Sequence, residues 1–182
     1  VSVWVAGSVS RPVTTLIELQ PGAKVVAAIC GAPEQKFLVA GSGGYGFVAT
    51  LDDMVSKQRA GRAFMTLEAH EEPIAPVALV AGLDHVAALS SRARLLVFPL
   101  AEMREVPRGR GVIILGLDGE ESLAAVGLAT ARKVILQGTN RLGRSIEVAV
   151  EGDDLAKHLL RRARKGRSVT QKLKVTGFGR AS

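Results

Sequence analysis

Glycine and arginine stand side by side at matching positions of three repeated segments, in Gly61-Arg62, Arg108-Gly109-Arg110 and Gly166-Arg167. Each pair has a further cation just before it. A guanidinium group forms paired hydrogen bonds with phosphate oxygens, and a neighbouring glycine lets the backbone approach a sugar-phosphate chain closely. Such contacts bind a long polyanion without reading its bases. These residue types therefore predict a phosphate-contacting surface.

The candidate phosphate contacts are the cations of these three loops and of the turns between strands. For any single arginine, ordinary solvated surface is an equally good interpretation, but three loops at matching positions favour a shared role. Aromatic residues, which stack on unpaired bases, make up only 4% of the chain, so a duplex is favoured over single strands. The candidates are Lys57, Arg59, Arg62, Arg92, Arg94, Arg104, Arg108, Arg110, Arg141, Arg144, Arg161, Arg162, Arg164, Lys165 and Arg167.

A glycine-rich run at residues 41–48 matches two nucleotide-binding patterns by its spacing. A dinucleotide fold needs a helix after the glycines, whereas a second strand is expected here. A kinase loop needs a downstream lysine strand and an H-R-D loop, and the sequence contains neither. The corresponding turns at 90–94 and 139–143 lack the glycine pattern. We therefore predict a hairpin turn that requires positive φ angles.

No catalytic or metal-binding arrangement is predicted. His70, His85 and His158 are far apart in sequence, and none has a ligand partner at metal spacing. The pairs Asp52-Asp53 and Asp153-Asp154 both follow a strand pattern, which favours turn capping through bonds to backbone amides over acid–base chemistry. No Ser-His-Asp or Cys-His arrangement is visible.

The composition favours an anionic partner. The formal net charge is +7 and the pI is about 10.1, while 47% hydrophobic content over 182 residues is enough for one sizeable core or a short array of units. Cys30 is the only cysteine, which excludes an internal disulfide, fits a reducing cytosol and predicts a buried side chain. No apolar run reaches membrane-spanning length, and the start at Val1, without a signal peptide or an initiator Met, indicates an excised fragment.

The elements that must position the loops are short strands arranged in a repeat of about 48 residues. Many short strands at steady spacing are typical of a sandwich, barrel or propeller, and the repeat favours the radial arrangement with about four strands per unit. One helix, at residues 153–165, and four units, at 1–31 (partial), 32–80, 81–130 and 131–182, are predicted. The predicted strands are residues 1–5, 16–19, 25–29, 37–40, 47–51, 64–67, 77–80, 86–89, 95–98, 112–115, 123–128, 134–136, 146–150 and 173–175.

The glycine turn and its basic loop also carry a resemblance to a known family. Residues 36–48, followed by Leu51-Asp-Asp-Met-Val55 and Arg59-Ala-Gly-Arg-Ala63, resemble the C-terminal domain of the A subunit of bacterial DNA topoisomerase IV. The segments 94–100, 107–111 and 173–177 extend the resemblance over most of the chain. The related domain of the gyrase A protein carries a box rich in glutamine, arginine and glycine. Only degenerate versions of that box are present here, at 108–111 and 165–167, which favours topoisomerase IV.

The resemblance implies an all-β fold, a β-pinwheel that is a propeller-like array of four-stranded blades with strand exchange, partial or open. Residues 1–182 would then form one domain whose basic rim holds or bends duplex DNA, guiding strand passage in decatenation and supercoil relaxation. The holoenzyme implied is an ATP-dependent type IIA topoisomerase, an isomerase, with ATP and Mg²⁺ bound on other domains. This domain itself would carry no catalytic residue, and Tyr45, in the hairpin turn, is not the family's nucleophile.

The implied partners are duplex DNA, the B subunit of topoisomerase IV and an SMC-type condensin, in the cytoplasm at the nucleoid and not at a membrane. Two alternatives remain open at this point. One is the C-terminal wrapping domain of the gyrase A protein. The other is a propeller-like protein-interaction scaffold whose charge serves only solubility.

Overall fold

A computed structural model describes residues 21–58, 60–169 and 173–179, which form three antiparallel sheets. Each sheet is built around a hairpin of two adjacent strands, and a third strand pairs with the first strand of that hairpin. The hairpins are β1 Lys36–Gly41 with β2 Tyr45–Thr50, β4 His85–Ser90 with β5 Arg94–Pro99, and β8 Lys133–Thr139 with β9 Ser145–Glu151. The third strands are β3 Pro73–Ala78, β7 Leu123–Ala129 and β11 Lys174–Phe178.

The first two sheets are each completed by a strand from the following repeat. β6 (Val112–Ile113) pairs with β2, and β10 (Arg167–Ser168) pairs with β5, so the strand orders are β3-β1-β2-β6 and β10-β5-β4-β7. This exchange confirms the expected pinwheel arrangement. The third sheet has the order β11-β8-β9 within the residues described.

Glycine makes the exchange possible, because the incoming backbone lies against the backbone of the receiving strand. A Cβ atom on Gly111 would lie 2.0 Å from the carbonyl oxygen of Gly46, and φ at Gly111 is +80°. Gly166 repeats this geometry, with φ of +70° and 2.7 Å to the carbonyl oxygen of Leu95. Both positions combine close approach with a conformation that other residues adopt at a cost.

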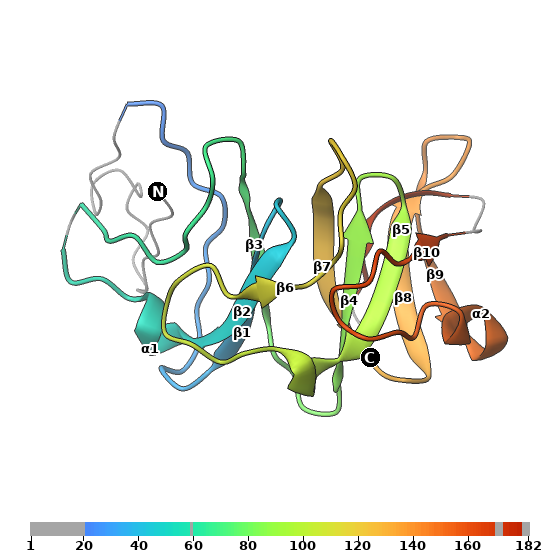
Figure 1. The fold of residues 1–182 in the computed structure, drawn as a ribbon, viewed down its shortest axis with the longest axis horizontal. Coiled ribbons are helices and arrows are strands. Elements are labelled where there is room, and N and C mark those ends of the chain that lie inside the picture. The colour runs from blue at the N-terminus through green and yellow to red at the C-terminus, as the bar shows by residue number, and fades with distance from the viewer. Residues whose placement is uncertain (1–20, 59, 170–172, 180–182) are drawn as a thin grey trace.

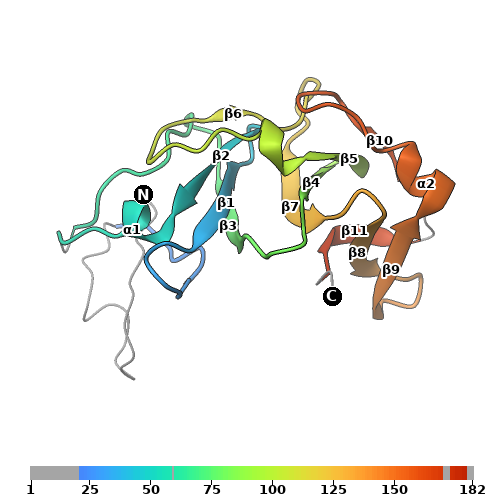
Figure 2. The ribbon, with the colours of Figure 1, turned by 90° about the horizontal axis from the view of Figure 1, so that it is seen from below.

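The sheets follow one another in an open arc (Figures 1 and 2). β7 contacts both β3 and β11, so the third strands of the three sheets are neighbours in space. The donated strands β6 and β10 both lie along the opposite edge of the arc in Figure 2, at different places on it. The arc has an inner side made by β3, β7 and β11, and an outer edge made by the exchanged segments.

Aliphatic side chains fill the core, as the low aromatic content requires. One apolar cluster joins the first two sheets through Leu38, Leu96, Phe98 and Ile114, which are fully buried. A second cluster joins the second and third sheets through residues such as Leu95 and Leu136, and a third lies beneath the first hairpin. The core therefore runs through the arc.

Two short helices and one 3-10 turn, η2 (Leu100–Glu102), follow the second strands of the hairpins. α1 (Leu51–Met54) begins with a capping box in which Thr50 and Asp53 bond to each other's backbone amides. This confirms the capping role predicted for Asp53. At α2 (Gly152–Ala156) no side-chain cap is present, and Asp154 instead pairs with Lys157 at 2.8 Å, so the capping prediction for Asp153-Asp154 was wrong.

Four sequence predictions need correction. The helix predicted at 153–165 ends at Ala156, because the following residues bond to β5 instead. Residues 25–29 and 64–67 form no strand, although Met65 makes an isolated bridge to Gly109, and Cys30 is exposed rather than buried. The strands predicted at 1–5 and 16–19 lie outside the described residues. Among the residues described, none of the helices is both long and apolar enough to cross a membrane.

Candidate nucleic-acid interface

The three Gly-Arg loops lie in a row, joined by backbone hydrogen bonds. The first and second loops bond to each other where Gly109 donates to Phe64 and Thr66 donates to Gly109, both at 3.0 Å. The second and third loops bond where Ala163 donates to Ile114 at 3.1 Å and Gly116 donates to Arg164 at 3.0 Å. Loops that are about one repeat apart in sequence therefore form one continuous edge, along which β6 and β10 run in Figure 2.

Arg110, in the second loop, is held by the first repeat. Its guanidinium pairs with Glu68 and, at 3.0 Å, with Glu71, and its Cζ lies 4.3 Å from the centre of the Tyr45 ring. The hydrogen bond to Glu68 is the main cause that raises the pKa of Arg110. Because its guanidinium is paired with two carboxylates of the first repeat, Arg110 links the two repeats. It is therefore less available to an external phosphate than its loop position indicates.

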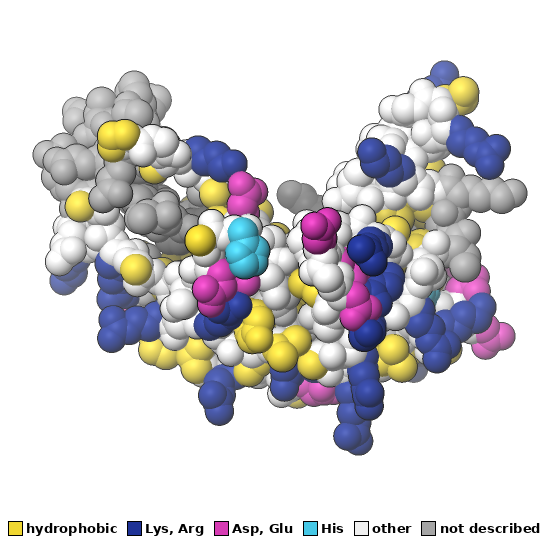
Figure 3. All heavy atoms as spheres, turned by 45° about the horizontal axis from the view of Figure 1, so that its top comes forward, with side chains coloured by type: hydrophobic (Ala, Val, Ile, Leu, Met, Phe, Trp, Pro, Cys, Tyr) yellow, Lys and Arg dark blue, Asp and Glu magenta, His cyan; other side chains and the backbone are white. Residues whose placement is uncertain are grey.

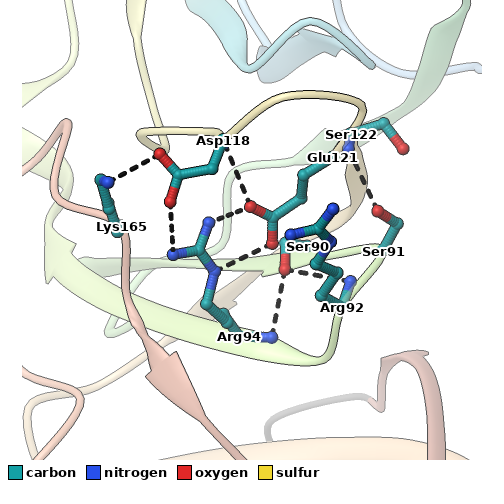
Figure 4. Close-up of polar contacts among 8 residues, drawn as sticks. All are labelled: Ser90, Ser91, Arg92, Arg94, Asp118, Glu121, Ser122 and Lys165. Atoms are coloured by element: carbon teal, nitrogen blue, oxygen red, sulfur yellow. Dashed lines mark hydrogen bonds and ion pairs between the residues drawn. The ribbon is translucent and has the colours of Figure 1, made fainter.

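Arg94, at the start of β5, occupies the position of Tyr45 one repeat later and is held in a similar way (Figure 4). Its guanidinium pairs with Glu121, whose side chain has no exposed surface, and its Nη1 lies 3.4 Å from Asp118. Lys165, from the third loop, reaches the other oxygen of Asp118 at 2.6 Å. Asp118 thus bridges the second sheet and the third loop, and the hydrogen bond from Lys165 is the main cause that lowers its pKa.

Both acidic turns have the same construction. The amide of Glu68 donates to the Glu71 carboxylate at 2.9 Å, and the amide of Asp118 donates to the Glu121 carboxylate at 3.3 Å. Each turn binds a cation of the next repeat, Arg110 in one case and Lys165 in the other. We call the acidic turn at 68–71 with Arg110, and the acidic turn at 118–121 with Lys165, the two inter-repeat clamps. Sequence reasoning missed them, although acidic residues three apart just before a strand were a visible signal.

Two further predicted cations are engaged inside the molecule. Arg162 donates from its Nη1 to the carbonyl oxygen of Ile113 at 2.6 Å, and its amide donates to Glu102 at 3.0 Å. Arg62 donates to the carbonyl oxygen of Asp53, at the end of α1. Arg162 therefore fastens the third loop to β6, and Arg62 fastens the first loop to α1.

The other predicted cations within the described residues are at least partly exposed and form no ion pair there. Figure 3 shows Lys and Arg side chains spread along the lower edge of the face in view, with acidic side chains nearer its middle. Arg59 lies outside the described residues. The remaining group comprises Lys57, Arg92, Arg104, Arg108, Arg141, Arg144, Arg161, Arg164 and Arg167.

His158 stands beside the third loop and is a structural residue. Its side chain is buried and its Nδ1 lies 3.2 Å from the carbonyl oxygen of Leu95, while its backbone bonds to Val97 of β5. Burial is the main cause that lowers the pKa of His158 from 6.5. The positive charges of Arg167 and Lys157 lower this pKa further, whereas the negative charge of Asp154 raises it. The sequence predicted that His158 lies in a helix, but this residue follows the end of α2 at Ala156.

This burial predicts a pH-dependent stability. Below pH 6.5 the unfolded chain binds a proton at His158 more readily than the folded chain, so the free energy of unfolding should fall as pH decreases from about 7.5 to 5.5. Urea unfolding of wild type and His158→Asn at both pH values tests this, because an asparagine amide can still donate to Leu95. The same substitution at exposed His70 is the control, and equal pH dependence in wild type and His158→Asn would refute the assignment.

The glycine run at 41–48 forms the predicted hairpin turn. Gly44 has φ of +84°, and Tyr45 begins β2. Ser42 closes the turn by accepting a bond from the Glu72 amide at 2.9 Å, and Ser91 does the same for Ser122 at 3.1 Å in the next repeat. The run is therefore structural.

Comparison with known proteins identifies the architecture. No protein-family model matches the chain. The A subunit of DNA topoisomerase 4 from Neisseria gonorrhoeae is 37% identical over 163 residues, which is 86% of this chain and 21% of that protein. The Escherichia coli K12 protein of the same name is 33% identical over 112 residues, 62% of this chain and 15% of that protein. The chain thus spans about a fifth of the length of the curated relatives.

The solved structure of the E. coli ParC C-terminal domain superposes with a TM-score of 0.77 at 28% identity, covering 90% of this chain and 67% of that one. The chain is a relative of the C-terminal domain of the topoisomerase IV A subunit. The family predicted from the glycine turn and the Arg-Ala-Gly-Arg loop is confirmed. The DNA gyrase A C-terminal domain has a TM-score of 0.67 at 15% identity over 95% of this chain and 59% of that one. That likeness shows the fold alone, so gyrase is the weaker alternative to topoisomerase IV.

Proposed function

We propose that this topoisomerase IV-type domain holds duplex DNA along the edge formed by its three Gly-Arg loops. The observation that carries this proposal is the backbone bonding of all three loops into one row, which gathers exposed arginines from separate repeats. A net charge of +7 adds a general attraction for polyanions. The exposed cations would contact phosphates, so binding would have little sequence preference.

The assembly and the reaction belong to the longer protein. We infer that the domain serves an ATP-dependent type IIA topoisomerase together with its B subunit, and that it helps select DNA crossings for decatenation and relaxation. Strand cleavage, ATP hydrolysis and Mg²⁺ binding would lie on other domains. Association with the nucleoid, and contact with an SMC-type condensin, would follow from the same role. This proposal rests on the similarity to the topoisomerase 4 protein of N. gonorrhoeae.

The direct test is fluorescence anisotropy with a labelled duplex of about 30 base pairs over a range of salt concentrations. Log affinity should fall linearly with log salt, with a slope of about −0.9 for each phosphate contact. Two duplexes of unrelated sequence should bind alike, and a single strand of the same length should bind less tightly. Absence of duplex binding at about 50 mM salt would refute the proposal and favour the protein-interaction scaffold.

A further inference from the structure

The turn between β8 and β9 differs from the two corresponding turns. Residues 42–44 and 91–93 connect the earlier hairpins, whereas residues 140–144 connect the third, which makes this turn two residues longer. In Figure 1 it is the orange loop at the upper right, away from β6 and β10. We call residues 140–144 the long tip.

Leu142 at the long tip is 78% exposed, more than any other large hydrophobic residue among those described; Val80 follows at 55%. Arg141 and Arg144 flank it, are both exposed and form no ion pair within the described residues. In Figure 3 hydrophobic and cationic side chains stand together at the upper right tip of the molecule. A single exposed leucine is common on protein surfaces. An exposed leucine between two arginines at a projecting tip is a more specific combination.

The long tip is also held in one conformation. The Asn140 side-chain oxygen accepts bonds from the amides of Leu142 at 2.9 Å and Arg144 at 3.0 Å. The Asn140 amide donates to the Arg144 carbonyl oxygen at 3.0 Å, and Gly143 adopts φ of +74°. These bonds fix the backbone that presents Leu142, so little conformational entropy would be lost when the tip binds.

We infer that the long tip is a wedge for the minor groove of duplex DNA, with Leu142 inserted between base pairs and Arg141 and Arg144 placed on the flanking phosphates. Proteins that kink a duplex use this combination of an apolar wedge and cations, and the unstacking is offset by the closer contact of a bent duplex. The inference rests on the proposed function, because it assumes a duplex held by the same domain. The apolar contact made by Leu142 releases no counterions. The salt dependence of affinity therefore distinguishes it from the phosphate contacts of the Gly-Arg loops.

The test uses the full chain and a duplex of about 30 base pairs that carries 2-aminopurine beside a central TA step, a step that kinks readily. The fluorescence of 2-aminopurine rises when its neighbour unstacks, and anisotropy on the same sample reports binding. Wild type should raise the fluorescence. Leu142→Ser should abolish the rise while changing affinity less than about tenfold and leaving the salt slope unchanged.

Matched variants separate the explanations. Leu142→Met keeps a bulky apolar side chain and should keep the fluorescence rise. Val80→Ser removes another exposed apolar residue and should behave as wild type. Because both sites are exposed, circular dichroism should show all three variants folded. Bound DNA with no fluorescence rise in wild type, or a rise that Leu142→Ser retains, overturns the wedge and leaves the proposed function standing. No binding by anisotropy overturns both.

Discussion

Replacing Arg94 by Ala is expected to lower the free energy of unfolding by about 3–5 kcal/mol, because the Glu121 carboxylate would stay buried without its partner. The side chain of Glu121 has no exposed surface, and that of Arg94 is only 17% exposed. For a chain of this size the loss corresponds to a decrease in Tm of about 6–20 °C. Thermal or urea unfolding followed by circular dichroism measures it.

Arg92 supplies the matched control, because it lies on the same turn, carries the same charge and is exposed. Arg92→Ala should change the free energy of unfolding by less than about 0.5 kcal/mol. The double variant Arg94→Met with Glu121→Leu removes both charges of the pair, so no unpaired carboxylate stays buried. It should recover most of the free energy of unfolding that Arg94→Ala loses. If Arg94→Ala and Arg92→Ala unfold at the same temperature, the Arg94–Glu121 pair does not stabilise the fold.

Removing Arg108, Arg164 and Arg167 together should have the largest effect on DNA binding. Each is at least partly exposed, and they lie on the second and third loops of the continuous edge. If each contacts one phosphate, the salt slope should decrease in magnitude by about 2.7, and affinity at about 0.1 M salt should fall by about 10²–10³-fold. Anisotropy titrations of wild type and the triple alanine variant between about 0.05 and 0.3 M salt measure both quantities.

A second triple variant keeps the change in net charge equal while leaving the edge intact. Arg132, Lys133 and Lys174 are cations on β8, on β11 and on the turn before β8, away from the Gly-Arg loops. Their replacement by Ala should reduce affinity only by the general effect of charge, well below the loss at the edge. Equal losses in the two variants would show that net charge, not the edge, governs binding.

Much of the fold could be predicted because hairpins have a strong local signal. Alternating apolar residues and turn glycines placed β1, β2, β4, β5 and β8 within two or three residues of their observed bounds. β10 could not be predicted, since a strand of two residues has no periodicity and exists only because β5 presents an unpaired edge. The helix expected at 153–165 stops early for the same reason, because β5 binds the backbone of residues 158–160.

The candidate site was predicted as a set of loops but not residue by residue. Sequence shows that Arg94, Arg108 and Arg110 are cations near a loop, yet it does not show which of them faces an acidic turn of another repeat. The structure gives Arg94 and Arg110 carboxylate partners and leaves Arg108 exposed. That difference depends on contacts between residues 27 to 42 positions apart, which no local pattern reveals.

The donated strands also set an order of events during synthesis on the ribosome. The first sheet receives β6 only after residue 113 has been made, although its own three strands end at Ala78. At about 5–20 residues per second, the 35 residues from 78 to 113 correspond to about 2–7 s during which the outer edge of β2 stays open. Nascent chains in neighbouring ribosomes of a polysome could capture that edge, so a slower elongation rate over 79–113 should increase misassembly.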